Sequence, residues 1–76
     1  MQHIVMPQLG ENVAEATLLN WCIQEGDRFQ EGDVIFEIET EKVAFDVEAP
    51  FSGTLTKILA PAGQSVPVLT PVGEVT

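Results

Sequence analysis

The sequence is poor in the residues that stabilise small proteins through covalent links or metals. Among its 76 residues there is one cysteine, Cys22, and one histidine, His3. One cysteine cannot form an internal disulfide, and one thiol with one imidazole falls short of the usual ligand set of a zinc site. We therefore expect no metal site, and a domain near the lower size limit that folds on a single apolar core.

Positive charge is also scarce. Three Lys and Arg residues stand against twelve Asp and Glu residues, which gives a formal net charge of −9. Such a chain repels a phosphate backbone, so we expect no nucleic acid as a partner. The same charge suits docking onto basic protein surfaces, and it suits equally well a surface that is acidic for solubility.

Long apolar runs and helical periodicity are missing as well. No run approaches the roughly 18 apolar residues of a membrane span, and the first residues resemble neither a signal nor a transit peptide. Short runs rich in Val, Ile, Leu, Phe and Thr alternate with Gly, Pro and Asp, which predicts an all-β fold. We expect strands at 3–6, 16–23, 34–39, 43–48, 53–60 and 71–75, with short extended stretches near Arg28 and Ser65.

The chain also contains an internal repeat. Matching residues stand at a constant offset of 37: Thr17 and Thr54, Leu18 and Leu55, Gly26 and Gly63, Ile35 and Val72, Glu37 and Glu74, Ile38 and Val75. Each half alone would leave an apolar strand face open to water, and packing the two halves together closes one core. The repeat predicts a flattened β-barrel or sandwich of two antiparallel sheets with internal quasi-two-fold symmetry, a barrel-sandwich hybrid.

A β-hairpin over 34–48 carries the most informative residue. Its core-facing residues are predicted to be Val34, Phe36, Ile38, Val43, Phe45 and Val47, and its solvent-facing residues Glu37, Glu39, Asp46 and Glu48 with Ala44. This alternation places Lys42 in the turn, and the repeat places the turn at the opposite end of the molecule from both termini. A lysine in a turn is most often a solvated charge, so residue chemistry alone establishes only exposure and rigid presentation.

The sequence resembles the lipoyl domain of the dihydrolipoamide acyltransferase component of 2-oxo acid dehydrogenase complexes. The similarity covers essentially the whole chain and includes MPQLGE at 6–11, Trp21, EGD at 25–27, EIETEKV at 37–43 and APFSG at 49–53. It implies a single non-catalytic domain over 1–76, with lipoic acid in amide linkage on Lys42 and with Glu41 and Val43 as flanking recognition residues. The family more often has Asp where this chain has Glu41, a change that keeps the charge.

The resemblance also implies partners and a role. The arm on Lys42 would shuttle acyl groups and reducing equivalents between a thiamine-dependent 2-oxo acid decarboxylase, the acyltransferase core and dihydrolipoamide dehydrogenase, after modification by lipoate-attaching enzymes. A surface loop would serve recognition by the decarboxylase; its residues are Leu9, Gly10, Glu11, Asn12, Val13, Ala14 and Glu15. We expect a monomeric domain, an excised piece of a longer acyltransferase, in the bacterial cytoplasm, with the mitochondrial matrix as the alternative.

Two other functions remain open from the sequence. A biotinyl carrier shares the fold, although biotinyl domains typically place their lysine between two methionines, and Glu41 and Val43 differ from these. An unmodified interaction module could keep the fold without any cofactor. Elsewhere we expect no catalytic residues: Trp21 and Cys22 are interpreted as packing residues, and Asp27 and Asp33 as turn residues.

Overall fold

The computed structural model describes residues 2–10 and 12–76, and within these residues all regular structure is β. None of the described segments forms a helix that could cross a membrane. The strands are β1 (Gln2–Val5), β2 (Glu15–Trp21), β3 (Arg28–Phe29), β4 (Val34–Glu39), β5 (Ala44–Glu48), β6 (Gly53–Ile58), β7 (Ser65–Pro67) and β8 (Pro71–Val75). The predicted strands at 34–39 and 71–75 are confirmed residue for residue. The strands expected at 16–23 and 53–60 end earlier, at Trp21 and Ile58.

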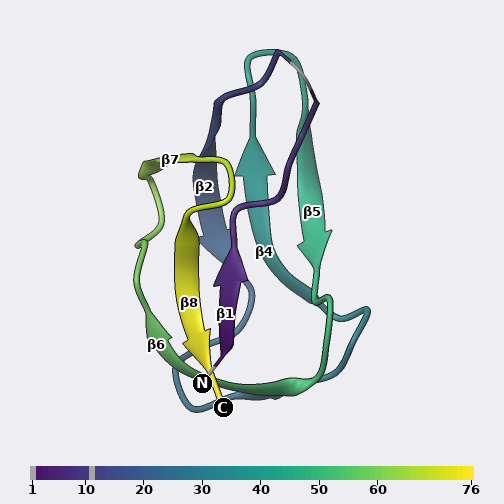
Figure 1. The fold of residues 1–76 in the computed structure, drawn as a ribbon, viewed down its shortest axis with the longest axis vertical. Coiled ribbons are helices and arrows are strands. Elements are labelled where there is room, and N and C mark those ends of the chain that lie inside the picture. The colour runs from purple at the N-terminus through teal and green to yellow at the C-terminus, as the bar shows by residue number, and fades with distance from the viewer. Residues whose placement is uncertain (1, 11) are drawn as a thin grey trace.

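The strands form two antiparallel sheets, shown in Figure 1. The sheet that contains both chain ends, which we call the terminal sheet, has the order β1-β8-β6-β3, and the other, the hairpin sheet, has the order β5-β4-β2-β7. The prediction of a sandwich of two antiparallel sheets is confirmed. The sheets do not close into a barrel, because each has its own separate ladder in the described part of the chain.

The internal repeat corresponds to a structural symmetry. Adding 37 to the residue numbers of β2, β3 and β4 gives β6, β7 and β8 almost without adjustment, and the two strand orders map onto each other. Backbone hydrogen bonds repeat too: Gly26 N–H donates to Leu55 O at 2.6 Å, and Gly63 N–H donates to Leu18 O at 2.6 Å. Both glycines have positive φ, a conformation that costs other L-residues steric strain. The quasi-two-fold prediction therefore holds in the backbone.

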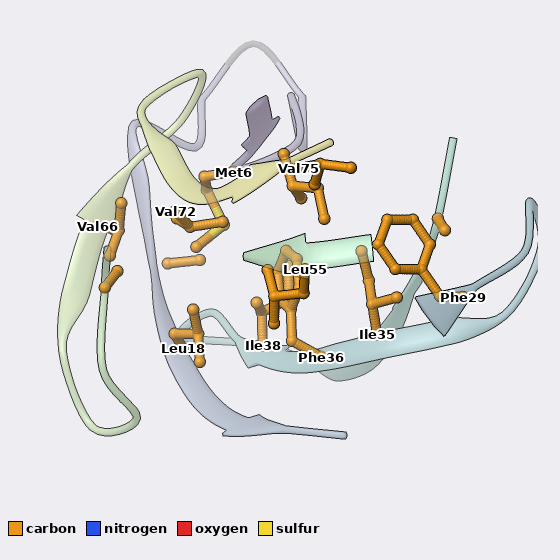
Figure 2. Packing of buried hydrophobic residues seen from close by; sticks show 14 residues of the cluster. Met6, Leu18, Phe29, Ile35, Phe36, Ile38, Leu55, Val66, Val72 and Val75 are labelled. Atoms are coloured by element: carbon orange, nitrogen blue, oxygen red, sulfur yellow. The ribbon is translucent and has the colours of Figure 1, made fainter. Parts of the chain in front are cut away.

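The core lies between the two sheets and is built from repeat-related pairs. The pairs Leu18 and Leu55, Ile35 and Val72, and Ile38 and Val75 are all fully buried. Figure 2 shows Leu18, Phe36 and Ile38 facing Met6, Val72 and Leu55 across this space. At the expected gain of roughly 25 cal/mol per Å² of buried apolar surface, this shared core is the main source of stability.

Three residues predicted to be in the core are exposed instead. Phe36 and Ile38 are buried as predicted, but Val34 is 37%, Val43 52% and Phe45 37% exposed. Val43 and Phe45 belong to the turn and the outermost strand of the hairpin sheet, where less of the opposite sheet covers them. The register of β4 shifts between Val34 and Phe36, so Ile35 is buried and Val34 is displaced from the core.

The two neighbouring residues Trp21 and Cys22 have different environments. Trp21 packs against the core, with its ring 5.1 Å from that of Phe36, and its Nε1–H donates to Ala60 O at 2.8 Å. Cys22 follows the end of β2 and is exposed. The packing prediction is confirmed for Trp21 and wrong for Cys22, because the strand ends before the cysteine.

Candidate functional site

Lys42 lies in the turn between β4 and β5, at the far end of the molecule from the two termini (Figure 1). The ladder of the hairpin ends at the pair Glu39 and Ala44, so the turn consists of residues 40–43, which we call the hairpin turn. Glu41, Lys42 and Val43 are all exposed. The arrangement presents the amine of Lys42 on the most projecting part of the hairpin sheet.

Thr40 organises the hairpin turn through both its backbone and its side chain. Its N–H donates to Val43 O at 2.8 Å, and its hydroxyl donates to the same oxygen at 3.3 Å. The hydroxyl oxygen also accepts from the N–H groups of Lys42 and Val43, each at 3.4 Å. Sequence reasoning missed Thr40, although a threonine at the start of a turn is a known signal for such side chain to backbone bonds.

An open groove of about 700 Å³ lies beside Lys42. Its lining comes from the hairpin, from the entry into β2 and from β7, and consists of Asn12, Val13, Ala14, Glu15, Ala16, Thr17, Glu39, Thr40, Glu41, Lys42 and Ser65. Within it, the Ser65 hydroxyl donates to Glu15 Oε2 at 3.0 Å. The groove brings residues from both ends of the sequence next to the hairpin turn.

The predicted recognition loop is only partly beside Lys42. Asn12, Val13, Ala14 and Glu15 line the same groove as the lysine. Leu9 instead packs, half-buried, against the core, and Gly10 adopts a positive φ of 131° in the turn before them. Glu11 lies outside the described residues. The last part of the loop is therefore the part that a partner could contact together with Lys42.

The groove exposes ionisable side chains to solvent and does not enclose a reaction centre. Its ionisable groups other than Lys42 are the carboxylates of Glu15, Glu39 and Glu41. Among the described residues no group of three or more His, Cys, Asp or Glu side chains could hold a metal ion. The chemistry available at this site is that of an accessible primary amine, which can be acylated by another enzyme.

Charge is distributed unequally between the two sheets. The strands of the hairpin sheet carry the carboxylates of Glu15, Glu37, Glu39, Asp46 and Glu48 and no lysine or arginine. The strands of the terminal sheet carry Arg28 and Lys57 with the single carboxylate Glu74. Although Cys22 is exposed, neighbouring atoms remove part of its thiol from water; this desolvation, and then the negative charges of Glu37 and Asp46, raise the pKa of the thiol. Lys42 thus adjoins the acidic sheet.

Comparison with known proteins matches this fold and site to one family. The family profile described as "Biotin-requiring enzyme" matches residues 2–75. The chain is 42% identical over 72 residues to the dihydrolipoyllysine-residue succinyltransferase component of the 2-oxoglutarate dehydrogenase complex from Rickettsia bellii, covering 95% of the chain and 18% of that protein. It is 48% identical over 61 residues to the corresponding acetyltransferase component of the pyruvate dehydrogenase complex from Rhizobium meliloti, covering 80% of the chain and 14% of that protein.

A solved structure supports the same assignment. The lipoyl domain of the 2-oxoglutarate dehydrogenase complex from Azotobacter vinelandii superposes with a TM-score of 0.77 at 28% identity, covering 97% of this chain and 94% of that domain. The chain spans less than a fifth of the length of the curated relatives it matches, and nearly all of this isolated domain. The similarity therefore concerns one domain of those larger proteins.

Proposed function

The chain belongs to the biotin-requiring enzyme family as one of its lipoyl domains, and from this premise we propose that Lys42 carries lipoic acid. The observation that carries the proposal is the exposed position of Lys42 in a hydrogen-bonded turn, at the end of the molecule opposite its termini. Amide formation would join its Nζ to the carboxyl carbon of lipoate that a lipoate-attaching enzyme has activated; the bond from that carbon to the activating group breaks, and the group and a proton of the amine leave. Glu41 and Val43 would be contacted by that enzyme because they flank the lysine and are exposed.

The domain is a non-catalytic carrier, and its fold supports that role. A bound lipoyl group supplies a dithiolane that accepts acyl groups and electrons. The protein holds the attachment point on a hairpin whose inner strand, β4, is anchored in the core by Ile35, Phe36 and Ile38. Tethering raises the local concentration of the reactive group at each enzyme it visits, while the protein contributes direction and reach.

The partners follow from the relatives' assemblies and form part of the proposal. They are a thiamine-dependent 2-oxo acid decarboxylase, an acyltransferase core, dihydrolipoamide dehydrogenase and the lipoate-attaching enzymes. Residues 1–76 would act as one monomeric domain of a longer acyltransferase in the bacterial cytoplasm. The acidic hairpin sheet supports docking of the Lys42 end onto basic partner surfaces.

The groove-lining part of the loop is proposed to contact the decarboxylase. Asn12, Val13 and Glu15 share the groove with Lys42, so a partner that receives the arm at this end meets them too. Substituting them should reduce reductive acylation more than lipoylation. Parallel assays of the two reactions on the same variants measure this difference, and equal losses in both, or none in either, would refute the recognition role.

The proposed function is tested by intact-mass measurement of the protein from cells supplied with lipoate. We expect a single lipoyl adduct on the wild type and on Lys57→Arg, and none on Lys42→Arg. Lys57 is the matched control because it is an exposed lysine on β6 of the terminal sheet. A biotin adduct, detected with streptavidin, would establish a biotinyl carrier instead, and an unmodified wild type would point to an interaction module.

A further inference from the structure

We propose that Thr40 is a positioning residue for the acylation of Lys42, because its hydroxyl holds the hairpin turn in the shape that presents the lysine. The inference rests on the proposed function, since it concerns how the attaching enzyme meets its target amine. Thr40 itself does not touch the reacting atoms. It acts through the backbone of Lys42 itself and of the next residue, Val43.

The geometry makes the Thr40 side chain the centre of the turn. Its oxygen accepts from two consecutive N–H groups, those of Lys42 and Val43, and its hydroxyl donates to the carbonyl of Val43. The distances of 3.3 to 3.4 Å are longer than a typical N–H···O bond, as expected when one oxygen is shared among several partners. Each contact is individually weak, and together they restrict the backbone on both sides of Lys42.

Besides these side-chain contacts, the described residues support the turn mainly through the backbone bond from Thr40 N–H to Val43 O at 2.8 Å. Val43 and the next inward-facing residue, Phe45, are exposed, so burial fixes the β5 side of the turn only weakly. The turns at Gly26 and Gly32 are different, since each has a glycine at φ 94° and a following aspartate that accepts a backbone N–H at 2.8 Å. The hairpin turn has no glycine, asparagine or aspartate, and Thr40 supplies the side-chain bonds that those residues supply elsewhere.

The expected consequence is a change in binding to the attaching enzyme. If only a fraction of the domains holds the turn in the presented shape, the apparent affinity of the enzyme falls to that fraction of its intrinsic value. Once the domain is bound, the turn is held by the enzyme, so the rate at saturation is unaffected. Loss of the Thr40 hydroxyl should therefore raise the KM for the domain about three- to tenfold and leave kcat unchanged.

The test is steady-state lipoylation of the purified domain, with lipoate and a lipoate-attaching enzyme, across three variants. Thr40→Val keeps the β-branched shape without the hydroxyl, and should raise KM. Thr40→Ser restores the hydroxyl, and should return KM to near the wild-type value. Thr56→Val is the matched control, because Thr56 Oγ1 also donates to a backbone oxygen, that of Glu74 at 3.0 Å, but on β6 of the terminal sheet.

The outcomes separate this inference from the proposed function. A wild-type KM in Thr40→Val, an equal rise in Thr56→Val, or a rise that Thr40→Ser fails to correct would overturn the positioning role while lipoylation of Lys42 still stands. Thermal unfolding of the same variants should show no loss of stability that parallels KM, and a parallel loss would also overturn it. A wild type that takes up no lipoate would instead overturn the proposed function, and this inference with it.

Discussion

The terminal sheet and the hairpin sheet follow the same strand plan but differ at their outermost strands. Gly73 and Phe36 are related by the offset of 37, and their partners on the outermost strands are therefore counterparts. Ile4 on β1 pairs with Gly73, and Val47 on β5 pairs with Phe36. Ile4 is 1% exposed and completes the core, whereas Val47 is half-buried. Further along β5, towards the turn, Phe45 is 37% exposed.

This difference separates the strands that stabilise the domain from the strand beside the turn that presents Lys42. Repeat-related residues of both sheets form the core, and β5, which begins at the hairpin turn, adds less to it. Under the proposed function, the surface that partner enzymes contact can then include apolar side chains beside Lys42 without being part of the core. We expect substitutions to divide in the same way, with large effects on stability in the paired core strands and small ones on β5.

The largest effect should come from comparing the two phenylalanines of the hairpin. Phe36→Ala should lower the free energy of unfolding by about 3–5 kcal/mol, because Phe36 is fully buried and packs on Trp21. Phe45→Ala should cost only about 1–2 kcal/mol, since the ring is already partly solvated. Urea unfolding of both variants measures the difference, and equal losses would contradict the division between β4 and β5.

A smaller loss of stability is expected at Gly53, where the terminal sheet is packed more tightly than the hairpin sheet is at the equivalent position. A Cβ on Gly53 would lie 2.5 Å from Val75 Cγ1, whereas Ala16, at the equivalent position of the hairpin sheet, is accommodated and buried. Gly53→Ala should therefore destabilise the domain by about 1–3 kcal/mol through overpacking. Ala16→Gly serves as the reciprocal control. A thermal midpoint of Gly53→Ala equal to that of the wild type would show that this close approach is readily relieved.

A third difference between the two halves of the repeat lies in which residue adopts the left-handed backbone conformation. Gly32 has φ 94°, and its repeat partner Leu69 has φ 68°, a conformation disfavoured for leucine. Leu69 is 59% exposed, so little buried surface is lost on replacing it. Leu69→Asn should stabilise the domain by about 0.5–1 kcal/mol, because asparagine tolerates this region. The reverse sign in chemical denaturation would mean that the leucine makes contacts that compensate its strain.

The smallest effect concerns the acidic face of the hairpin sheet. Desolvation of the exposed thiol and the charges of Glu37 and Asp46 raise the pKa of Cys22, so its thiolate fraction at a given pH is lower than in the unfolded chain. Its reaction with a thiol reagent should accordingly rise at higher pH in the folded protein than in urea. Glu37→Gln and Asp46→Asn should shift that profile towards lower pH. Superimposable profiles for the folded and unfolded protein would contradict this electrostatic account.

Much of the fold was predictable because its signals are local or repeated. Period-two alternation located β4 and predicted the burial of Phe36 and Ile38, which the structure confirms, and the offset of 37 predicted the two related halves. Ile35, which the structure also buries, was not among the predicted core residues. The same offset predicted that Lys42 lies far from the termini. These features depend on the spacing of residues along the chain, which the sequence contains directly.

The errors arose where exposure depends on distant parts of the chain. Alternation says which side chains share a face of β5, but whether the opposite sheet covers Phe45 depends on strand order and length. The register shift beside Val34 was invisible for the same reason. Thr40 is a different case, because its bonds to Lys42 and Val43 are local and a threonine at the start of a turn already signals them. The groove beside Lys42 joins segments as distant as Asn12 and Ser65.

The central claim, that Lys42 carries the arm, is tested most directly by tryptic mapping of the protein from lipoate-supplied cells. Trypsin cuts after the three basic residues Arg28, Lys42 and Lys57, and it does not cut after an acylated lysine. The account predicts one peptide spanning residues 29–57 with a lipoyl group located on Lys42 by fragmentation. Separate unmodified peptides 29–42 and 43–57 would contradict it, whether or not a lipoyl adduct is found elsewhere.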